Sequence, residues 1–291
     1  MNILSIINPN SGTKDSIEVY NKCKPKIIDK GYIVDEIITT HHMHAYDEIK
    51  NISSNIDQII LFGGDGTAHE VVNGLIRFNK QIPIGIVPCG SGNSIMHDLN
   101  QLDYTCAIET ILRNKKRDID ILEVKCKQQT LYAANIVGWG MVTDIGVSAE
   151  KYRWLGTSRY TLMSVVEVFK YNKRPAKLSI DGEVINESFL FVMASNTIHT
   201  GKGMKISPKA KIDDGLMDVV VVKDGPSRLK LLNLLPKIFD GTHINEKEVL
   251  YIQAKEIQLI TEEEVLNIDG ELKGSTPISI RVLPNKIKIL N

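Results

Sequence analysis

The stretch from Asp57 to Leu75 constrains the fold of this chain more than any other feature of the sequence. It opens with an apolar run, Ile59 to Phe62, that has the length and composition of a buried parallel strand. The glycine-rich string GGDG follows, and a helix pattern then begins, with apolar residues repeating on one face. Thr67 followed three residues later by Glu70 is a capping box, which predicts that the helix starts at Thr67. A strand, a glycine loop and a helix in this order are typical of an α/β unit with a parallel sheet.

Two further glycine-bearing loops follow apolar runs in the same part of the chain. NPNSG, residues 8–12, follows the run 3–7, and PCGSGN, residues 88–93, follows the run 84–87. Such loops gather at the carboxyl edge of an open α/β sheet, where ligands bind. Glycine next to a helix N-terminus lets backbone N–H groups approach an anion, so we expect a phosphate here. Asp65 would repel a phosphate unless a divalent cation or a proton transfer is involved, and the competing interpretation is a tight turn whose aspartate caps the helix.

The N-terminal part of the chain alternates strand and helix patterns. We expect strands near 2–7, 32–38, 57–62 and 83–87, and helices near 15–29, 45–54, 67–78, 92–98 and 103–113. This alternation predicts a doubly wound, mostly parallel α/β domain. From Asp118 onward most segments are strands joined by short turns, among them TLYAANIVG at 130–138, and helices are expected only near 151–171 and 227–239. This second pattern predicts a C-terminal antiparallel β-sandwich domain.

Composition argues against several classes of protein. The 35 Lys and Arg residues equal the 35 Asp and Glu residues, so no overall field attracts an acidic membrane, and no nucleic-acid partner is expected. The longest apolar runs are strand-sized, far below the roughly 20 residues that a membrane span needs. The start of the sequence, MNILSIINPNSG, lacks a charged region and a cleavage site, so we expect a cytoplasmic protein. The four cysteines show no paired spacing, which argues against a disulfide framework and a cysteine-based zinc site.

Two common nucleotide-binding motifs are also missing from the sequence. The chain contains no GxxxxGK[ST] string, which argues against a P-loop kinase. It contains no GxGxxG after a strand either, which argues against a dinucleotide-binding fold. A nucleotide site in this chain is therefore expected to use the loops around GGDG.

Three motifs in a fixed order carry a family resemblance. NPNSG, GGDGT with HEVVNGL, and PCGSGN resemble the diacylglycerol kinase/sphingosine kinase superfamily of lipid kinases. EKYRWLG at 150–156 resembles the sphingosine and ceramide kinase branch in particular, and so do DDGL at 213–216 and the late DGE at 269–271. The resemblance runs from Asn8 to about Lys273, which is nearly the whole chain.

The resemblance implies that the chain has two domains with different roles. Residues 1–120 would form the nucleotide-binding catalytic domain, to which a final strand at 285–291 returns. Residues 121–284 would form the β-rich lipid-acceptor domain, with the active site in the cleft between the two. ATP and Mg²⁺ are the implied cofactors.

A kinase of this kind needs groups that hold the phosphates of ATP. The three glycine loops can do so through backbone N–H groups, and the resemblance adds Thr39, Glu70 and two arginines. Arg153 and Arg159 match ATP-contacting arginines of the family, and a guanidinium suits phosphate because it can donate two hydrogen bonds at once. The predicted cofactor-binding residues are Asn8, Ser11, Gly12, Thr39, Gly63, Gly64, Gly66, Thr67, Glu70, Gly90, Ser91, Gly92, Asn93, Arg153, Arg159 and Gly270.

Two groups of carboxylates compete for the role of the base that accepts the hydroxyl proton. Asp65 has this role in the sphingosine kinase branch that the chain resembles. In bacterial diacylglycerol kinases the matching aspartate serves magnesium–ATP, and the late Asp-Gly-Glu, here Asp269 and Glu271, supplies the base. We predict that Asp65 is essential and holds the metal, with Asp269 and Glu271 close to the transferring phosphate. The alternative for Asp269-Gly270-Glu271 is a hairpin turn, because Asp-Gly is a favoured hairpin pair.

The acceptor is harder to predict than the reaction. Sphingosine kinases carry a second aspartate two residues after the one that matches Asp144, and this chain has Gly146 there. We predict a sphingoid long-chain base or a related lipid alcohol, with diacylglycerol as the alternative. NAD kinases and polyphosphate kinases share GGDGT, and a non-catalytic lipid- or nucleotide-binding relative is a further alternative. The expected partner is a lipid at a membrane surface, reached by peripheral contact, and a homodimer is left open.

Overall fold

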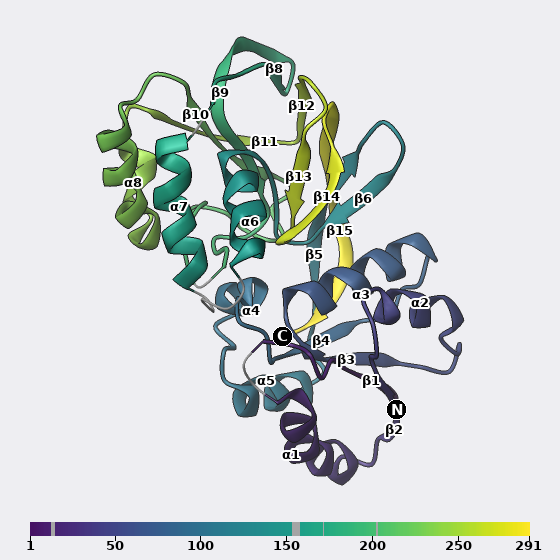
Figure 1. Ribbon diagram of the computed structural model, residues 1–291. Helices are drawn as coiled ribbons and strands as arrows, with labels where there is room; N and C mark the ends of the chain where they lie inside the picture. The colour runs from purple at the N-terminus through teal and green to yellow at the C-terminus, as the bar shows by residue number, and fades with distance from the viewer. Residues whose placement is uncertain (13–14, 153–157, 171, 202) are drawn as a thin grey trace. The chain divides into compact units, whose positions relative to one another are not determined.

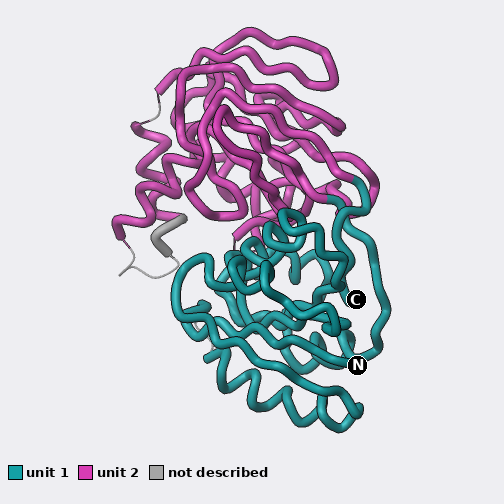
Figure 2. The backbone as a smooth tube through the Cα atoms, turned by 90° about the vertical axis from the view of Figure 1, so that its right-hand side faces the viewer, with its two compact units in different colours: residues 1–120, 284–291 teal, residues 121–283 magenta. Residues whose placement is uncertain are grey.

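The computed structural model describes residues 1–12, 15–152, 158–170, 172–201 and 203–291. The chain forms two compact units: residues 1–120 with 284–291 make up unit 1, and residues 121–283 make up unit 2 (Figure 2). The chain leaves one unit for the other inside two strands, β5 (Lys116–Lys125) and β15 (Ile278–Leu290). Unit 1 therefore contains both ends of the chain.

Unit 1 is a parallel sheet covered by helices on its two faces. Its strands lie in the order β15-β4-β3-β1-β2, and each neighbouring pair is parallel. Helices α1 and α5 pack on Ile60 and Phe62 of β3, and α2 and α3 cover the other face (Figure 1). The predicted doubly wound parallel α/β domain is confirmed. Its elements are β1 (Asn2–Ile7), α1 (Ser16–Asp29), β2 (Ile33–Ile38), α2 (His44–Asn51), β3 (Gln58–Gly63), α3 (Asp65–Arg77), β4 (Ile84–Pro88), α4 (Ser94–Asp98) and α5 (Tyr104–Ile111).

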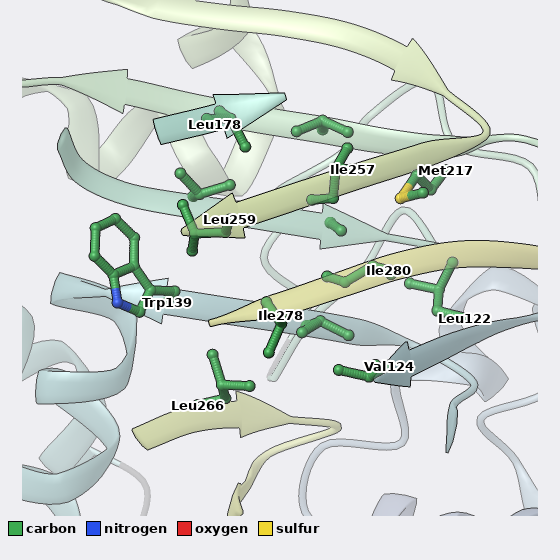
Figure 3. Close-up of a cluster of buried hydrophobic side chains, with 14 of the residues drawn as sticks. Leu122, Val124, Trp139, Leu178, Met217, Ile257, Leu259, Leu266, Ile278 and Ile280 are labelled. Atoms are coloured by element: carbon green, nitrogen blue, oxygen red, sulfur yellow. The ribbon is translucent and has the colours of Figure 1, made fainter. Parts of the chain in front are cut away.

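Unit 2 is an antiparallel β-sandwich with three α-helices among its described residues. Its strands follow the order β14-β13-β7-β9-β8-β12-β15, while β10 pairs with β9 and β11, and β5 pairs with β6. Apolar side chains of several strands, among them Trp139, Leu259 and Ile280, meet in one buried core (Figure 3). The predicted sandwich is confirmed. The elements after β5 are β6 (Thr130–Ala133), β7 (Ile136–Gly140), α6 (Met141–Lys151), α7 (Ser158–Lys170), β8 (Arg174–Ile180), β9 (Glu183–Ser195), β10 (Met217–Lys223), α8 (Arg228–Asp240), the 3₁₀-helix η2 (Thr242–Asn245), β11 (Val249–Ala254), β12 (Glu256–Ile260), β13 (Val265–Ile268) and β14 (Glu271–Ser275).

Two predictions for unit 2 are wrong. TLYAANIVG is not one strand, because β6 ends at Ala133 and β7 begins at Ile136. Helix α6 is not predicted by the sequence pattern at all. Its N-cap is Gly140, which has φ 85° and offers no side chain to cap the helix, so the usual start signal is missing. Among the described residues, every helix is too short or too polar to cross a bilayer.

Candidate active site

Three glycine loops meet at the carboxyl edge of the unit 1 sheet, after β1, β3 and β4. A Cβ atom at Gly64 would lie 2.7 Å from the Cα of Gly90, and a Cβ at Gly90 would lie 2.5 Å from the Cα of Gly64. Gly12 has φ 59°, and a Cβ there would lie 2.6 Å from the carbonyl oxygen of Cys89. Distances this short leave no room for any side chain. The glycines are therefore required for the loops to pack backbone against backbone, which the expected role in phosphate binding did not anticipate.

Hydrogen bonds fix the same loops. Asn8 Nδ2 donates to Thr67 Oγ1 at 2.9 Å, and this contact joins the loop after β1 to helix α3. The backbone N–H of Cys89 donates to the carbonyl of Gly63 at 2.9 Å. Asn93, which has φ 52°, accepts from the N–H of Gly90 at 3.0 Å and donates to its carbonyl at 2.8 Å. This left-handed residue delays the helix expected from 92, so that α4 begins at Ser94. Ser11, Ser91 and Gly92 lie within the loops after β1 and β4, and Gly66 is the second residue of α3.

Asp65 joins the start of two helices. It is the first residue of α3, and its carboxylate accepts from the backbone N–H of Ser94 at 2.7 Å and from Ser94 Oγ at 3.3 Å. The competing expectation that this aspartate caps a helix is thus met, but the capped helix is α4 and not its own. A negative charge at these two N-termini is stabilised by the helix dipoles and by a charge-assisted hydrogen bond. The carboxylate of Asp65 is therefore held beside the start of α4, next to the loop after β4.

The predicted capping box does not form. Helix α3 begins at Asp65 with Gly64 as its N-cap, which makes no side-chain hydrogen bond. Thr67 instead accepts from Asn8, and the buried carboxylate of Glu70 accepts from the backbone N–H groups of Met43 at 2.9 Å and Ala45 at 3.1 Å. Glu70 therefore supplies acceptors for backbone N–H groups at the start of α2 that have no partner within the helix. The N-cap of α2, Met43, makes no capping hydrogen bond with its own side chain. This contact anchors the segment just after Thr39, a buried residue next to the end of β2.

The late Asp269-Gly270-Glu271 forms a hairpin turn between β13 and β14. Asp269 and Gly270 have φ 53° and 92°, the combination of two positive φ values that Asp-Gly favours in two-residue hairpins. The buried carboxylate of Asp269 accepts three backbone hydrogen bonds, from Ala134 at 3.0 Å, Asn135 at 2.9 Å and Ile136 at 3.0 Å. These bonds fall where β6 stops and β7 begins, and they explain the interruption of the predicted strand. Glu271 lies 3.0 Å from Lys273 in an ion pair.

Charged side chains also lie around Asp144 on α6. Arg174 Nη2 donates to both carboxylate oxygens of Asp144, at 2.9 and 2.7 Å, and Arg174 Nε donates to Glu264 at 2.8 Å. Burial raises the pKa of the Asp144 carboxyl above its ordinary value, and the guanidinium of Arg174 opposes that shift. A Cβ at Gly146 would lie 3.5 Å from Asn267 and from Leu272, which is ordinary van der Waals contact. Among the residues whose side chains are described, Arg174 is therefore the cation paired with Asp144.

The two predicted arginines cannot be placed in the site. Arg153 lies outside the described residues, as does most of EKYRWLG. Arg159 belongs to the first turn of α7, and its side chain is not among those described. Within the described residues, no group of three or more His, Cys, Asp or Glu side chains is arranged to hold a metal ion.

Comparison with known proteins matches both units to described domains. The model of the diacylglycerol kinase catalytic domain matches residues 2–124, and the YegS C-terminal NAD kinase beta sandwich-like domain matches residues 135–291, which is more than half of the chain. The chain belongs to the diacylglycerol kinase/sphingosine kinase superfamily. The resemblance seen in the sequence is confirmed, and membership makes the chain a lipid kinase, that is, a phosphotransferase.

Relatives of this lipid kinase come from both branches of the superfamily. Sphingosine kinase 2 of Arabidopsis thaliana is 28% identical over 93% of this chain and 68% of its own length. The diacylglycerol kinase of Bacillus subtilis is 27% identical over 94% of this chain and 90% of its own length. A crystal structure of a candidate diacylglycerol kinase from Bacillus anthracis has a TM-score of 0.84 at 25% identity and covers 99% of this chain and 96% of its own.

Two residues that contact the predicted site residues were not among those predicted for this lipid kinase. Ser94 directly follows PCGSGN and begins a short helix. That position is the one sequence signal that could have marked Ser94 as a site residue. Asn135 lies at the strand interruption, and its side chain accepts a hydrogen bond from Thr197. Both act through partners that are distant in sequence, so spacing alone could not identify them.

Asp269→Asn is expected to lower the free energy of unfolding of this lipid kinase by about 2–4 kcal/mol, measured by urea unfolding. The amide keeps one acceptor oxygen but turns an N–H donor toward backbone N–H donors, and it loses the charge that strengthens the bonds. Asp181→Asn is the matched control, because the Asp181 carboxylate also accepts backbone bonds, from Lys255 and Glu256, but in an exposed turn. Equal unfolding midpoints for Asp269→Asn and the wild-type chain would contradict the structural role of Asp269.

Proposed function

We propose that this lipid kinase transfers the γ-phosphate of ATP, with Mg²⁺, to the hydroxyl of a neutral glycerolipid of the diacylglycerol type. The observation that supports the neutral acceptor best is the Asp144–Arg174 contact at 2.7 Å. A carboxylate already paired with a guanidinium is a poor partner for the ammonium group of a sphingoid base. In addition, Gly146 stands where sphingosine kinases carry a second aspartate. The long match to bacterial diacylglycerol kinases points the same way.

The acceptor proposed second is a sphingoid long-chain base. EKYRWLG resembles the sphingosine kinase branch, and plant sphingosine kinases are among the relatives at 28% and 27% identity. The choice between the two acceptors depends on whether the ammonium group of a sphingoid base can pair with the carboxylate of Asp144. That question can be answered by changing Arg174.

For the phosphates of ATP, the proposed binding groups are the backbone N–H groups of the three glycine loops. They suit this role because the loops pack closely on one another and because a hydrogen bond joins the start of α3 to the start of α4. Asp65 fits Mg²⁺, which proteins hold through one or two carboxylates together with substrate phosphates. Magnesium bound to ATP would neutralise the charge that develops on the transferred group.

For the proton of the acceptor hydroxyl, the proposed base is Asp65. Asp269 is less suited, because its carboxylate already accepts three backbone hydrogen bonds and is needed for the turn. We assign Asp269 a positioning role, with Gly270 and Glu271 beside it. The proposed setting is the cytoplasmic side of a membrane, where the lipid substrate resides.

Labelled-phosphate transfer to diacylglycerol, monoacylglycerol, ceramide and sphingosine tests the proposal. The wild-type chain should label diacylglycerol, with sphingosine at least about tenfold lower in kcat/KM, a difference of about 1.4 kcal/mol. Arg174→Gln should raise sphingosine relative to diacylglycerol by about tenfold, because the ammonium can then meet Asp144. Arg281→Gln is the matched control, since Arg281 pairs with Glu123 elsewhere in unit 2. Preferential labelling of sphingosine by the wild-type chain would refute the neutral acceptor, and labelling of NAD with no lipid product would refute the proposed reaction.

A further inference from the structure

Helix α6 contacts both strands of the hairpin formed by β13 and β14, and Gly146 is the helix residue next to that hairpin (Figure 1). A Cβ atom at Gly146 would lie 3.5 Å from Asn267 Nδ2 on β13 and 3.5 Å from Leu272 Cδ2 on β14. These distances are ordinary van der Waals contact, so the surrounding atoms leave room for an alanine. Glycine is a poor residue for the interior of a helix. The packing of the protein itself therefore does not require a glycine at this position.

The side-chain amide of Asn267 has one end in use and one end open. Its Oδ1 accepts from the backbone N–H of Gly270 at 2.9 Å. Because a backbone N–H can only donate, this bond identifies the oxygen end of the amide, and Nδ2 is the end that faces Gly146. Among the groups that the structure describes, none accepts a hydrogen bond from Nδ2. Asn267 is half-buried, so a ligand can reach these N–H groups.

The position of Asn267 is fixed by its surroundings. Its strand, β13, is paired on both sides, with Gly138 of β7 and Leu272 of β14 opposite Asn267. The bond to Gly270 also ties the amide to the turn that carries Asp269 and Glu271. A donor held in this way loses little freedom when a ligand binds, which is what selective recognition requires.

The chemistry of this donor suits one class of acceptor. Diacylglycerol has one hydroxyl group, which receives the phosphate, and its ester carbonyl oxygens are the polar groups left for recognition. An ester carbonyl can only accept a hydrogen bond, whereas the ammonium group of a sphingoid base can only donate. An amide N–H therefore pairs with the glycerolipid and gives the ammonium no partner. The exposed side chain of Leu272 supplies an apolar neighbour for the carbon atoms beside the ester.

We propose that Asn267 selects the acceptor of this lipid kinase by donating from Nδ2 to an ester carbonyl oxygen of the glycerolipid, in the space that Gly146 leaves free. The inference rests on the proposed function and names the group that reads the neutral acceptor. Asn267 thereby joins the two ends of its amide to different tasks, because Oδ1 holds the turn while Nδ2 contacts the lipid.

A pair of substrates tests the contact within one protein. Dioctanoylglycerol carries ester carbonyls, and the matching dioctyl diether of glycerol lacks them. In detergent micelles the wild-type chain should use the ester at least about tenfold better in kcat/KM, which corresponds to about 1.4 kcal/mol. The ratio of the two values does not depend on the fraction of folded protein.

Asn267→Asp removes the donor and keeps the shape. The carboxylate retains an oxygen for the N–H of Gly270 but has no N–H to offer the lipid. The ratio of ester to ether use should fall to about one, and sphingosine should gain about tenfold or more relative to dioctanoylglycerol, because the new carboxylate can meet its ammonium. Asn186→Asp, the same change on an exposed asparagine of β9, is the matched control and should keep the wild-type ratio.

Gly146→Ala tests the space rather than the donor. The methyl group fits the protein, so the unfolding midpoint should not fall, but it fills the place proposed for the carbonyl and should reduce the ester preference by about tenfold. A wild-type chain that phosphorylates dioctanoylglycerol and the diether equally well would overturn this inference alone, since the amide would then face only water. An unchanged ratio in Asn267→Asp would do the same. A wild-type chain that labels no lipid, or that prefers sphingosine, would remove the proposed function and this inference with it.

Discussion

Asp65→Asn is expected to lower kcat for phosphate transfer by about a thousandfold or more, which corresponds to about 4 kcal/mol of transition-state stabilisation. The substitution removes the charge proposed to hold Mg²⁺ and the group proposed to accept the hydroxyl proton. It keeps the size of the side chain and one oxygen that can accept from the N–H of Ser94, so the fold should remain intact. The measurement is kcat at saturating ATP and lipid, with unfolding followed in parallel.

Ser94→Ala separates the chemistry of Asp65 from its orientation. This change removes the hydroxyl bond at 3.3 Å and leaves both the carboxylate and the backbone bond at 2.7 Å. We expect a loss of no more than about tenfold, because the remaining bond is the shorter one and still fixes the carboxylate. Near-wild-type turnover by Asp65→Asn would show that Asp65 is not essential. Equal losses in the two variants would assign it a purely structural role.

Gly90→Ala is expected to abolish measurable transfer and to lower the free energy of unfolding by about 3 kcal/mol or more. The new methyl group would lie 2.5 Å from the Cα of Gly64 and 2.8 Å from Asn93 Oδ1. Because one neighbour is backbone, the loops after β3 and β4 have to separate, and Asp65 moves with them. Transfer assays and thermal unfolding report the two effects.

Gly31→Ala is the control for the general cost of replacing a glycine. Gly31 has φ 75° but nothing within 4 Å of its Cβ position, so alanine there brings backbone strain without a collision. That strain is worth about 1 kcal/mol and should leave transfer unchanged. If Gly90→Ala cost no more than Gly31→Ala, the close packing of the loops would be disproved.

The elements of unit 1 could be predicted because each depends on a local pattern. The run 59–62 is a strand at every position expected, and Asp15 and Asp103 cap α1 and α5 close to the predicted starts. The same local reasoning failed at Thr67 and Glu70. Their side chains bond to residues of other loops, and these tertiary partners prevail over the capping-box pattern.

Unit 2 was predicted less completely because its irregularities have distant causes. The interruption between β6 and β7 depends on Asp269, more than 130 residues further along the chain. Helix α6 contains Gly146 and several β-branched residues, which are poor helix formers, and packing against β7 and β13 supports it. The glycine loops after β1, β3 and β4 could be located from the sequence, but the close contacts of Gly12, Gly64 and Gly90 could not, because they join residues that are distant in the chain.

The place of residues 284–291 in unit 1 affects how the protein is made. The end of β15 pairs with β4 at Ile84, and Asn291 and Lys288 bond to Lys115 and Asp118. A ribosome must therefore translate all of residues 121–283 before β4 receives its outer neighbour. During that interval the nascent unit 1 presents an unpaired strand edge, the kind of edge that recruits other chains. Because of this topology, the free edge of β4 needs protection from other chains until residues 284–291 have left the ribosome.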